Sequence, residues 1–297
     1  MTIASAGQAR VFKSTGVGGL DFESFPMRLF QKAKKFGIWD PQSFDFSKDR
    51  ADWESFTPEQ REVLLHLSSL FLGGEESVTL DLLPLIGVVA EEGRLEEEMY
   101  LTSFLWEEAK HVEVFRRFLD EVARDSSDLT RFHGPSYQAI FYQELPGALG
   151  RLRKDPSPVA QAEASVTYNL IVEGVLAETG YHAYFQMLEA NDVMPAMREV
   201  VGKLKQDESR HLAYGVYLLS RLVAEHGDEV WEAIDRRMNH LLPLALGMID
   251  EMFAAYDELP FGLSMDDFVT FATTQFQKRY ERVAKAREQD LEEIVGT

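Results

Sequence analysis

The sequence predicts an all-α fold, built on a four-helix bundle core with additional helices. No run of residues alternates as strands do, with hairpin signals between them. The hydrophobic fraction is 45%, which is enough to form a large core. Four helical patterns of about 30 residues would each form a helix about 45 Å long, and such helices need partners along their whole apolar face. Since no linker divides the chain, we expect one domain over residues 1–297.

Helix start and stop signals place the elements in order. Residues 1–25 are rich in Gly and Ser and are expected to be irregular. Thr57-Pro58-Glu59-Gln60 is a capping box with proline at the first helical position, and Gly73-Gly74 is a weak point in the helix that follows. Gly93 ends this pattern, and a less regular stretch over 126–156 contains three prolines. The predicted helices are 26–36, 58–92, 94–124, 158–190, 195–227, 228–256 and 265–293.

The charge of the chain excludes several kinds of partner. Acidic residues outnumber basic residues 50 to 30, which gives a formal net charge of −20. Such a surface repels phosphate, so we expect no nucleic-acid partner and no docking on anionic lipid. The most apolar run, Leu80 to Ala90, is too short to span a bilayer and contains Asp81. The N-terminus has no apolar core of signal-peptide type, so we expect a soluble cytoplasmic protein without membrane insertion.

The chain contains no cysteine. This excludes disulfides, iron–sulfur clusters, thiolate zinc sites and cysteine nucleophiles. Any metal ion must therefore be held by His, Asp or Glu, which are ligands for harder ions such as iron and manganese.

Two of the seven histidines follow a glutamate by three residues, in the pairs Glu108–His111 and Glu208–His211. Residues at i and i+3 are neighbours on one helix face, so each pair could hold one ion. Seven histidines among 50 acidic residues in 297 would give about one such pair by chance, so the pairs alone are weak evidence.

The surrounding repeat is more informative than either pair. Glu75 lies 33 residues before Glu108, and Glu173 lies 35 residues before Glu208, each on the preceding predicted helix. Two antiparallel helix pairs packed together would bring four glutamates and two histidines to the centre of the bundle, which is the ligand set of a dimetal site in ferritin-like proteins. Four buried carboxylates cannot all stay ionised without compensation, and two cations supply it.

A coincidental set of surface acids is the other interpretation of this pattern. The neighbouring residues argue against it, because an unpaired charge in an apolar stripe is costly. These neighbours are Leu101, Phe104, Leu105, Val112 and Phe115 around the first pair, and Leu170, Ile171, Val172 and Val175 around Glu173. Asp207 either fixes the free ring nitrogen of a ligating histidine or is a solvated acid. The other five histidines are interpreted as structural or surface residues.

These motifs resemble the ribonucleotide reductase small-subunit superfamily over about residues 26–290. Within it, the chain is most similar to the small-subunit-like ligand-binding oxidases with a mixed manganese–iron site. The resemblance rests on Gly73-Gly74-Glu75-Glu76-Ser77-Val78-Thr79, Glu107-Glu108-Ala109-Lys110-His111, Tyr168-Asn-Leu-Ile-Val-Glu173 and Asp207-Glu208-Ser-Arg-His211.

The resemblance implies one manganese and one iron ion per chain, with two irons as the alternative loading. It implies that Glu108 bridges the ions. It also implies a homodimer and a long-chain fatty acid, or a similar hydrophobic ligand, whose carboxylate bridges the metals from an apolar channel. The implied ligands are Glu75, Glu108 and His111 for manganese, and Glu173, Glu208 and His211 for iron.

The resemblance further implies an ether cross-link between Val78 Cβ and the Tyr168 oxygen, formed during O₂ activation. Val78 is one turn beyond Glu75 and can approach the metals. Tyr168 is five residues before Glu173, which is about 140° away from it on a regular helix. We hypothesise a π-bulge between Tyr168 and Glu173, because it would turn the tyrosine toward the metals.

Three features bear on the choice between an oxidase and a reductase subunit. Phe115 occupies the position where radical-storing subunits carry a tyrosine, although some subunits work with phenylalanine and a manganese–iron site. The C-terminus, Gln289–Thr297, lacks the aromatic tail expected for radical relay to a large subunit. Trp39 occupies the place of a relay tryptophan, where it either forms a remnant chain with Asp207 and His111 or simply packs.

The leading hypothesis is an O₂-activating dimetal oxidase that removes two electrons from a C–H-bearing target. A reductase small subunit is the first alternative and would need a large-subunit partner. An acyl desaturase-like diiron enzyme is the second, but it docks an acidic acyl carrier, which a net charge of −20 suits poorly. A ferritin-like metal store would need a cage of about 24 short subunits, whereas this chain is nearly twice as long as a single four-helix bundle.

Overall fold

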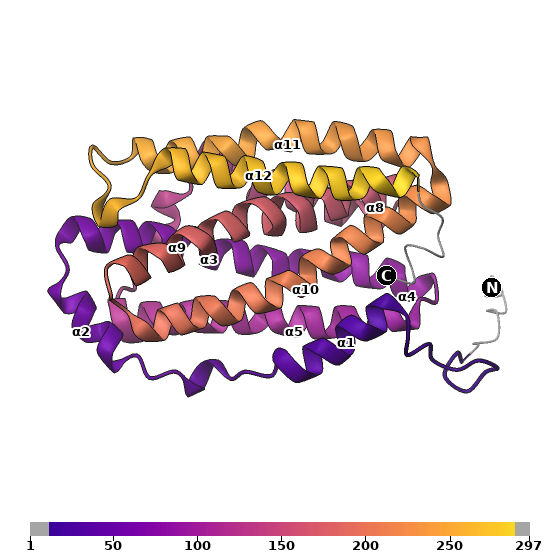
Figure 1. Ribbon diagram of the computed structural model, residues 1–297, viewed down its shortest axis with the longest axis horizontal. Helices are drawn as coiled ribbons and strands as arrows, with labels where there is room; N and C mark the ends of the chain where they lie inside the picture. Colours follow the sequence, from indigo (N-terminus) through magenta and orange to yellow (C-terminus); the bar gives the residue numbers. More distant parts are fainter. Residues whose placement is uncertain (1–11, 289–297) are drawn as a thin grey trace, which may run out of the picture.

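The computed structural model describes residues 12–288, and all regular structure in this part of the chain is helical. Figure 1 shows the long helices lying side by side along the long axis of the molecule. Among the described residues, no helix is both long and apolar enough to cross a membrane. The α-helices are α1 (Phe25–Phe36), α2 (Ser47–Ser55), α3 (Pro58–Asp81), α4 (Leu83–Glu91), α5 (Leu95–Arg117), α6 (Pro135–Tyr137), α7 (Leu145–Arg151), α8 (Pro158–Ser165), α9 (Glu178–Ala190), α10 (Pro195–His226), α11 (Asp228–Ala254) and α12 (Met265–Ala284).

Within residues 12–288, three π-helical segments continue α-helices without a break. They are η2 (Phe118–Ala123) after α5, η4 (Gln138–Glu144) between α6 and α7, and η5 (Val166–Ala177) between α8 and α9. The bundle core consists of α3, α5, α10 and the composite helix α8–η5–α9, which contact one another. Helices α11 and α12 cover the composite helix on one side, and α1 packs against α5 and α10 on another (Figure 1). The all-α prediction is therefore confirmed.

The first long helix begins as predicted and ends earlier. Thr57 Oγ1 accepts a hydrogen bond from the Gln60 N–H at 3.3 Å, and the Gln60 side chain accepts one from the Thr57 N–H at 3.0 Å. The prediction that one helix runs to residue 92 is wrong, because α3 ends at Asp81 and α4 begins at Leu83. Pro84 explains the break, since it has no N–H to donate and clashes with the preceding turn. The predicted weak point, Gly73-Gly74, lies inside an unbroken helix.

The stretch over 126–156 is more helical than predicted, because α6, η4 and α7 together run through residues 135–151. Pro135 starts α6, where a helix needs no N–H donor. Pro146 falls at the start of α7, where the hydrogen bonding changes from π to α, and is tolerated there. Helix α2 was not predicted. Residues 12–24 form turns as expected, while 1–11 and 289–297, with the predicted helix end at 293, lie outside the described residues.

Helix α2 holds the start of α10, the helix that carries Glu208 and His211. The Asp49 carboxylate accepts hydrogen bonds from the backbone N–H groups of Ala196 at 3.0 Å and Met197 at 2.8 Å. Asp49 is completely buried, and its negative charge lies at the positive end of the α10 dipole. These bonds satisfy donors that no residue of α10 itself can pair.

Candidate metal centre

Six acidic and imidazole side chains meet in the middle of the bundle, and all of them are buried. Their possible ligand atoms form two groups, within each of which the atoms lie within 4.8 Å of one another. The first group contains Glu75 from α3, Glu108 and His111 from α5, and Glu208 from α10. The second contains Glu108, Glu173 from η5 and His211 from α10. Glu108 belongs to both groups, so it lies where a bridging carboxylate would lie.

The distances around the two imidazoles show how compact the cluster is. His111 Nδ1 lies 3.2 Å from a Glu75 oxygen and 3.5 Å from oxygens of Glu108 and Glu208. His211 Nδ1 lies 3.0 Å from a Glu108 oxygen and 3.6 Å from oxygens of Glu208 and Glu173. Glu208 thus lies near both imidazoles, although the resemblance assigns it to the ion of His211.

Both imidazoles point Nδ1 into the cluster and Nε2 outward, where each meets a carboxylate. His111 Nε2 lies 3.4 Å from Asp207 Oδ2, and His211 Nε2 lies 2.8 Å from Glu107 Oε2. Arg210 donates to Glu107 at 2.6 Å and to Asp207 at 2.5 Å, and so links the two carboxylates. A carboxylate behind a ligating histidine fixes the ring and makes it a better ligand. Asp207 lies in this position behind His111 and is completely buried, so it is not the solvated acid of the second interpretation.

The π-helix around Glu173 confirms the hypothesis drawn from the Tyr168 spacing. Segment η5 is π-helical from Val166 to Ala177 and contains both residues. Within it, Asn169 Nδ2 donates to Glu173 Oε2 at 2.9 Å and orients that carboxylate. Gly215 on α10 makes room for this contact, because a Cβ there would lie 2.2 Å from Asn169 Cβ. Helix α10 can therefore approach the π segment closely enough for its own ligands to join the cluster.

The electrostatics of the cluster favour cations. Burial raises the pKa of Glu75 to about 8 and, with a neighbouring carboxylate, raises the pKa of Glu173 well above its ordinary value. Burial opposes charge on His111 and His211 too, but the surrounding carboxylates outweigh it and raise both pKa values well above 6.5. Burial also disfavours the carboxylate form of Glu108, yet the two imidazoles lower its pKa below the usual range. Without metal, the cluster therefore holds protons that bound cations would displace.

Several atoms of the cluster have no hydrogen-bond partner although they are buried. They are both oxygens of Glu108, Glu173 Oε1, Glu208 Oε2 and His211 Nδ1. Unpaired buried acceptors are costly, and atoms of this kind that face a common centre are suited to metal coordination. The residues present therefore fit a pair of cations with oxygen and nitrogen ligands.

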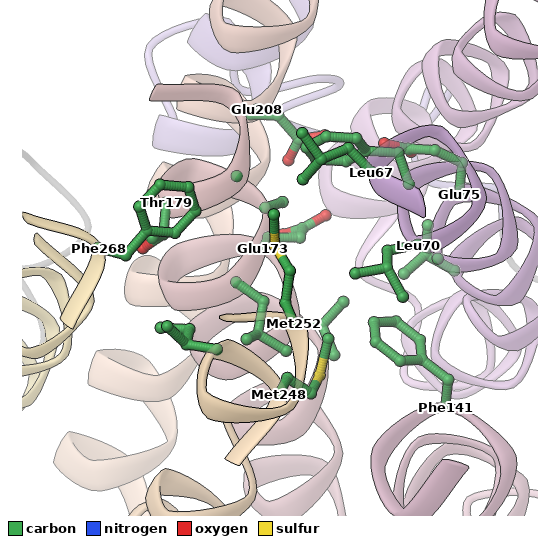
Figure 2. A pocket seen from close by; sticks show the side chains of 18 of the residues that line it. Leu67, Leu70, Glu75, Phe141, Glu173, Thr179, Glu208, Met248, Met252 and Phe268 are labelled. Atoms are coloured by element: carbon green, nitrogen blue, oxygen red, sulfur yellow. The ribbon is translucent and has the colours of Figure 1, made fainter. Parts of the chain in front are cut away.

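An apolar pocket, here called the inner pocket, opens beside the cluster. Figure 2 shows Glu75, Glu173 and Glu208 at one end of it, with Leu67, Leu70, Met248, Met252 and Phe141 around the remainder. Its only polar lining side chains are the four glutamates of the cluster and Thr179. The empty space is about 790 Å³ when its opening to solvent is included.

Val78 and Tyr168 lie close to each other beside the inner pocket. Val78 lines the inner pocket, and Tyr168 Oη lies 3.5 Å from the Val78 backbone oxygen. Both residues are buried, and burial raises the pKa of Tyr168 well above its ordinary value. Phe115 stacks on Phe71 with ring centroids 5.3 Å apart, and no phenol oxygen occupies that position.

Sequence reasoning missed three residues that contact side chains of the cluster. Glu107 contacts His211, Asn169 contacts Glu173, and the Tyr181 hydroxyl donates to Glu75. One signal for Glu107 was present in the sequence, because an acidic residue precedes the glutamate of both Glu-x-x-His pairs. No comparable signal marks Asn169 or Tyr181.

Comparison with known proteins was made with this geometry established. The sequence model of the ribonucleotide reductase small chain matches residues 28–281. The chain belongs to the ribonucleotide reductase small-chain family. An R2-like ligand-binding oxidase from Sulfolobus acidocaldarius is 39% identical with a TM-score of 0.87, and the match covers 96% of this chain and 98% of that chain.

Other members of this family with similar structures carry metal. A mutant R2-like ligand-binding oxidase with an aerobically reconstituted Mn/Fe cofactor is 36% identical with a TM-score of 0.86, covering 89% of this chain and 95% of that chain. A second mutant, with an anaerobically reconstituted Mn/Fe cofactor, is 36% identical with a TM-score of 0.88, covering 93% and 98%. The family resemblance predicted from the sequence is confirmed, and the chain is an oxidoreductase of this family.

Proposed function

We propose that this protein is an O₂-activating dimetal oxidase that holds one manganese and one iron ion per chain, with two irons as the alternative loading. The observation that carries the proposal is the buried carboxylate–imidazole cluster, whose two groups share Glu108 and whose inward atoms lack partners. The apolar lining of the inner pocket beside it would favour a hydrophobic ligand over water next to the reaction. The Mn/Fe cofactor of similar oxidase structures supports the choice of metals.

The proposed roles of the six ligands follow the resemblance. Bound reduced metal ions would give electrons to O₂ and supply the oxidising power to remove two electrons from a C–H-bearing target. The chain's own side chains hold the ligands in place through the carboxylates behind each imidazole. In this proposal Glu75, Glu108 and His111 hold manganese, Glu173, Glu208 and His211 hold iron, and Glu108 bridges the two ions.

The proposed ligand is a long-chain fatty acid or a similar hydrophobic acid. Its carboxylate would be attracted to the cations at the cluster, and its alkyl chain would lie along the apolar lining of the inner pocket. Support for a bound ligand comes from the similar structures, which are named ligand-binding oxidases. The C–H-bearing target is proposed to be hydrophobic for the same reason.

The proposed oxidation of the protein itself joins Val78 Cβ to Tyr168 Oη. The Cβ–H and O–H bonds break, one C–O bond forms, and two electrons and two protons pass to O₂ as the co-reactant. Support comes from the burial of both side chains and from the phenol's place beside Val78. In the similar structures the substituted residues include a glycine, a valine four residues later and a tyrosine 90 residues after the valine, which matches the spacing of Gly74, Val78 and Tyr168.

Peptide mapping after metal loading tests this proposal. Trypsin would release Val78 in the peptide 62–94 and Tyr168 in the peptide 155–198, because neither range contains an internal Lys or Arg. After aerobic loading with Mn²⁺ and Fe²⁺, we expect the two peptides to elute as one species whose mass is their sum less two hydrogens. Anaerobic loading should leave them separate.

Two variants act as controls. Tyr168→Phe keeps the ring but removes the oxygen, and it should bind metal without losing hydrogens. Glu208→Ala removes a proposed ligand, and it should lose both the metal pair and the cross-link. Separate, unmodified peptides from wild-type protein that contains both metals and has reacted with O₂ would contradict the proposed cross-link.

A reductase small subunit is the second candidate, and one observation favours it. Trp39 Nε1 donates to Asp207 Oδ2 at 2.7 Å, and the same oxygen lies 3.4 Å from His111 Nε2, so these three side chains form the contacts that a radical relay would need. Phe115 argues against radical storage. Formation of deoxyribonucleotide by the metal-loaded protein mixed with a reductase large subunit would favour this candidate over the oxidase.

We also propose that the chain acts as one domain in a cytoplasmic homodimer. A reducing compartment suits a site that must be loaded with reduced metal ions. Size-exclusion chromatography with light scattering tests the assembly, and a mass of one chain would contradict it.

A further inference from the structure

The inner pocket and a neighbouring hollow on the surface share one wall. Leu70, Met248 and Met252 line both spaces. The hollow, here called the outer hollow, lies between α3, α11 and the segment before η4, and its lining includes the polar side chains of His66 and Arg131. The shared side chains therefore separate the inner pocket from a space on the surface of the molecule.

The wall consists mainly of two methionines from one face of α11. Met248 and Met252 are four residues apart, so they lie one above the other on the helix. Met252 is buried and Met248 is half-buried. Figure 2 shows Met248 on the side of the inner pocket away from Glu208, with Met252 between Met248 and Glu173. Methionine is unbranched and adapts its shape to what packs against it, so this wall can yield to a longer ligand at low cost.

A second wall of the inner pocket is less adaptable. Thr179 and Phe268 line both the inner pocket and another surface hollow. Phe268 is buried and packs edge-on against Phe253, with ring centroids 5.2 Å apart. A ring held in this way has few other positions to adopt. The methionine wall is therefore the end at which a change of ligand length is most easily accommodated.

We propose that Met248 and Met252 form the end wall that sets the length of alkyl chain accepted by the inner pocket. This inference rests on the proposed function, because it needs a hydrophobic acid whose head lies at the cluster. With the head fixed there, each added methylene brings the tail closer to the methionines. Beyond them the chain would enter the outer hollow, which is open to solvent, so the added methylenes would stay partly in water and gain less from burial.

The size of the effect follows from the atoms removed. Met→Ala deletes three heavy atoms from the wall, which is room for about two to three methylenes. Each methylene that becomes buried strengthens binding about fourfold. We compare the amount retained of two acids: the acid that wild type prefers and the acid two carbons longer. The ratio of the longer acid to the preferred acid should rise by about tenfold or more in Met252→Ala, and by a similar factor in Met248→Ala.

A competition experiment measures this preference. Protein stripped of lipid is loaded with Mn²⁺ and Fe²⁺ and mixed with equal amounts of saturated fatty acids of twelve to twenty carbons. Unbound acid is removed, and the retained acids are extracted and quantified by mass spectrometry together with the metal content. Met252→Phe makes the side chain in the wall larger and should shift retention to shorter acids. It tests the proposal in the opposite direction and does not depend on whether the alanine variants fold.

Two controls separate the wall from its surroundings. Ile249→Ala changes a side chain on the same helix that lines the inner pocket but not the outer hollow, and its preferred length should stay that of wild type. Phe268→Ala opens the second wall, which contains Thr179 and Phe268. Unchanged preference in the methionine variants, or a shift seen in Phe268→Ala alone, would overturn the inference while the proposed function stands. Retention of no acid by wild type with both metals bound would overturn the proposed ligand, and this inference with it.

Discussion

Glu107 is predicted to control how tightly the ion beside His211 is held. Its Oε2 lies 2.8 Å from His211 Nε2, and its Oε1 accepts from Arg210 at 2.6 Å. Glu107→Gln keeps the size of this completely buried side chain but removes its charge and one of its two acceptors. Carboxylates behind ligating histidines typically contribute 10–100-fold to metal affinity. We therefore expect one ion to bind roughly 10–100-fold more weakly, which is about 1.4–2.7 kcal/mol.

Chelator competition followed by elemental analysis measures this loss. Wild type should keep two ions per chain at a chelator concentration where Glu107→Gln keeps about one. Glu113→Gln on the same helix is the matched control, because Glu113 is half-buried and accepts from Gln42 rather than from a histidine. Equal metal retention in the two variants would refute the reasoning that Glu107 acts through His211.

Three further predictions concern stability, each measured by urea denaturation of the metal-free chain. Burial lowers the pKa of His66 from 6.5 to about 4. Between these pH values the unfolded chain binds more protons at this residue than the folded chain does. The unfolding free energy should therefore fall by up to about 3 kcal/mol as the pH drops from about 6.5 to about 4. A His66→Gln variant with the same pH profile would contradict this. Asp49→Ala should lower the unfolding free energy by about 2–4 kcal/mol, because two buried N–H groups at the start of α10 lose their acceptor. A decrease of less than about 0.5 kcal/mol would show that this helix cap is dispensable. Gly180→Ala should lower the unfolding free energy by about 1–3 kcal/mol, because its Cβ would lie 2.6 Å from a Phe71 ring atom. The control Gly202→Ala places its Cβ where no atom lies within 4 Å, and it should raise the unfolding free energy by up to about 1 kcal/mol. Similar effects of the two alanines would rule out the packing argument.

The ligand pairs could be predicted from the sequence because helix periodicity alone places i and i+3 on one face. The repeat of Glu75 and Glu173 before the pairs then indicated which helices had to meet. The five-residue spacing of Tyr168 and Glu173 predicted the π-helix, because on a regular helix the two side chains could not both point toward one centre. The pairs and the repeat needed only local geometry and the assumption that buried charges are compensated, whereas the π-helix also rested on the family resemblance, which implies that Tyr168 lies at the metals.

The residues around the ligands could not be predicted in the same way. Glu107 and His211 are 104 residues apart, and Tyr181 and Glu75 are 106 apart, so their contacts depend on how whole helices are aligned. Local sequence patterns do not contain that alignment. The break before Pro84 was available from the sequence, since proline disrupts a helix, whereas Pro146 lies within a continuous helical stretch because a π segment precedes it.

Anomalous diffraction at the manganese and iron absorption edges tests the central claim most directly. Crystals of protein supplied with both metals should show two peaks within the cluster, one on each side of Glu108. The peak bordered by Glu75 and His111 should scatter as manganese, and the peak bordered by Glu173 and His211 as iron. An empty cluster, or ions bound among other residues, would contradict the account.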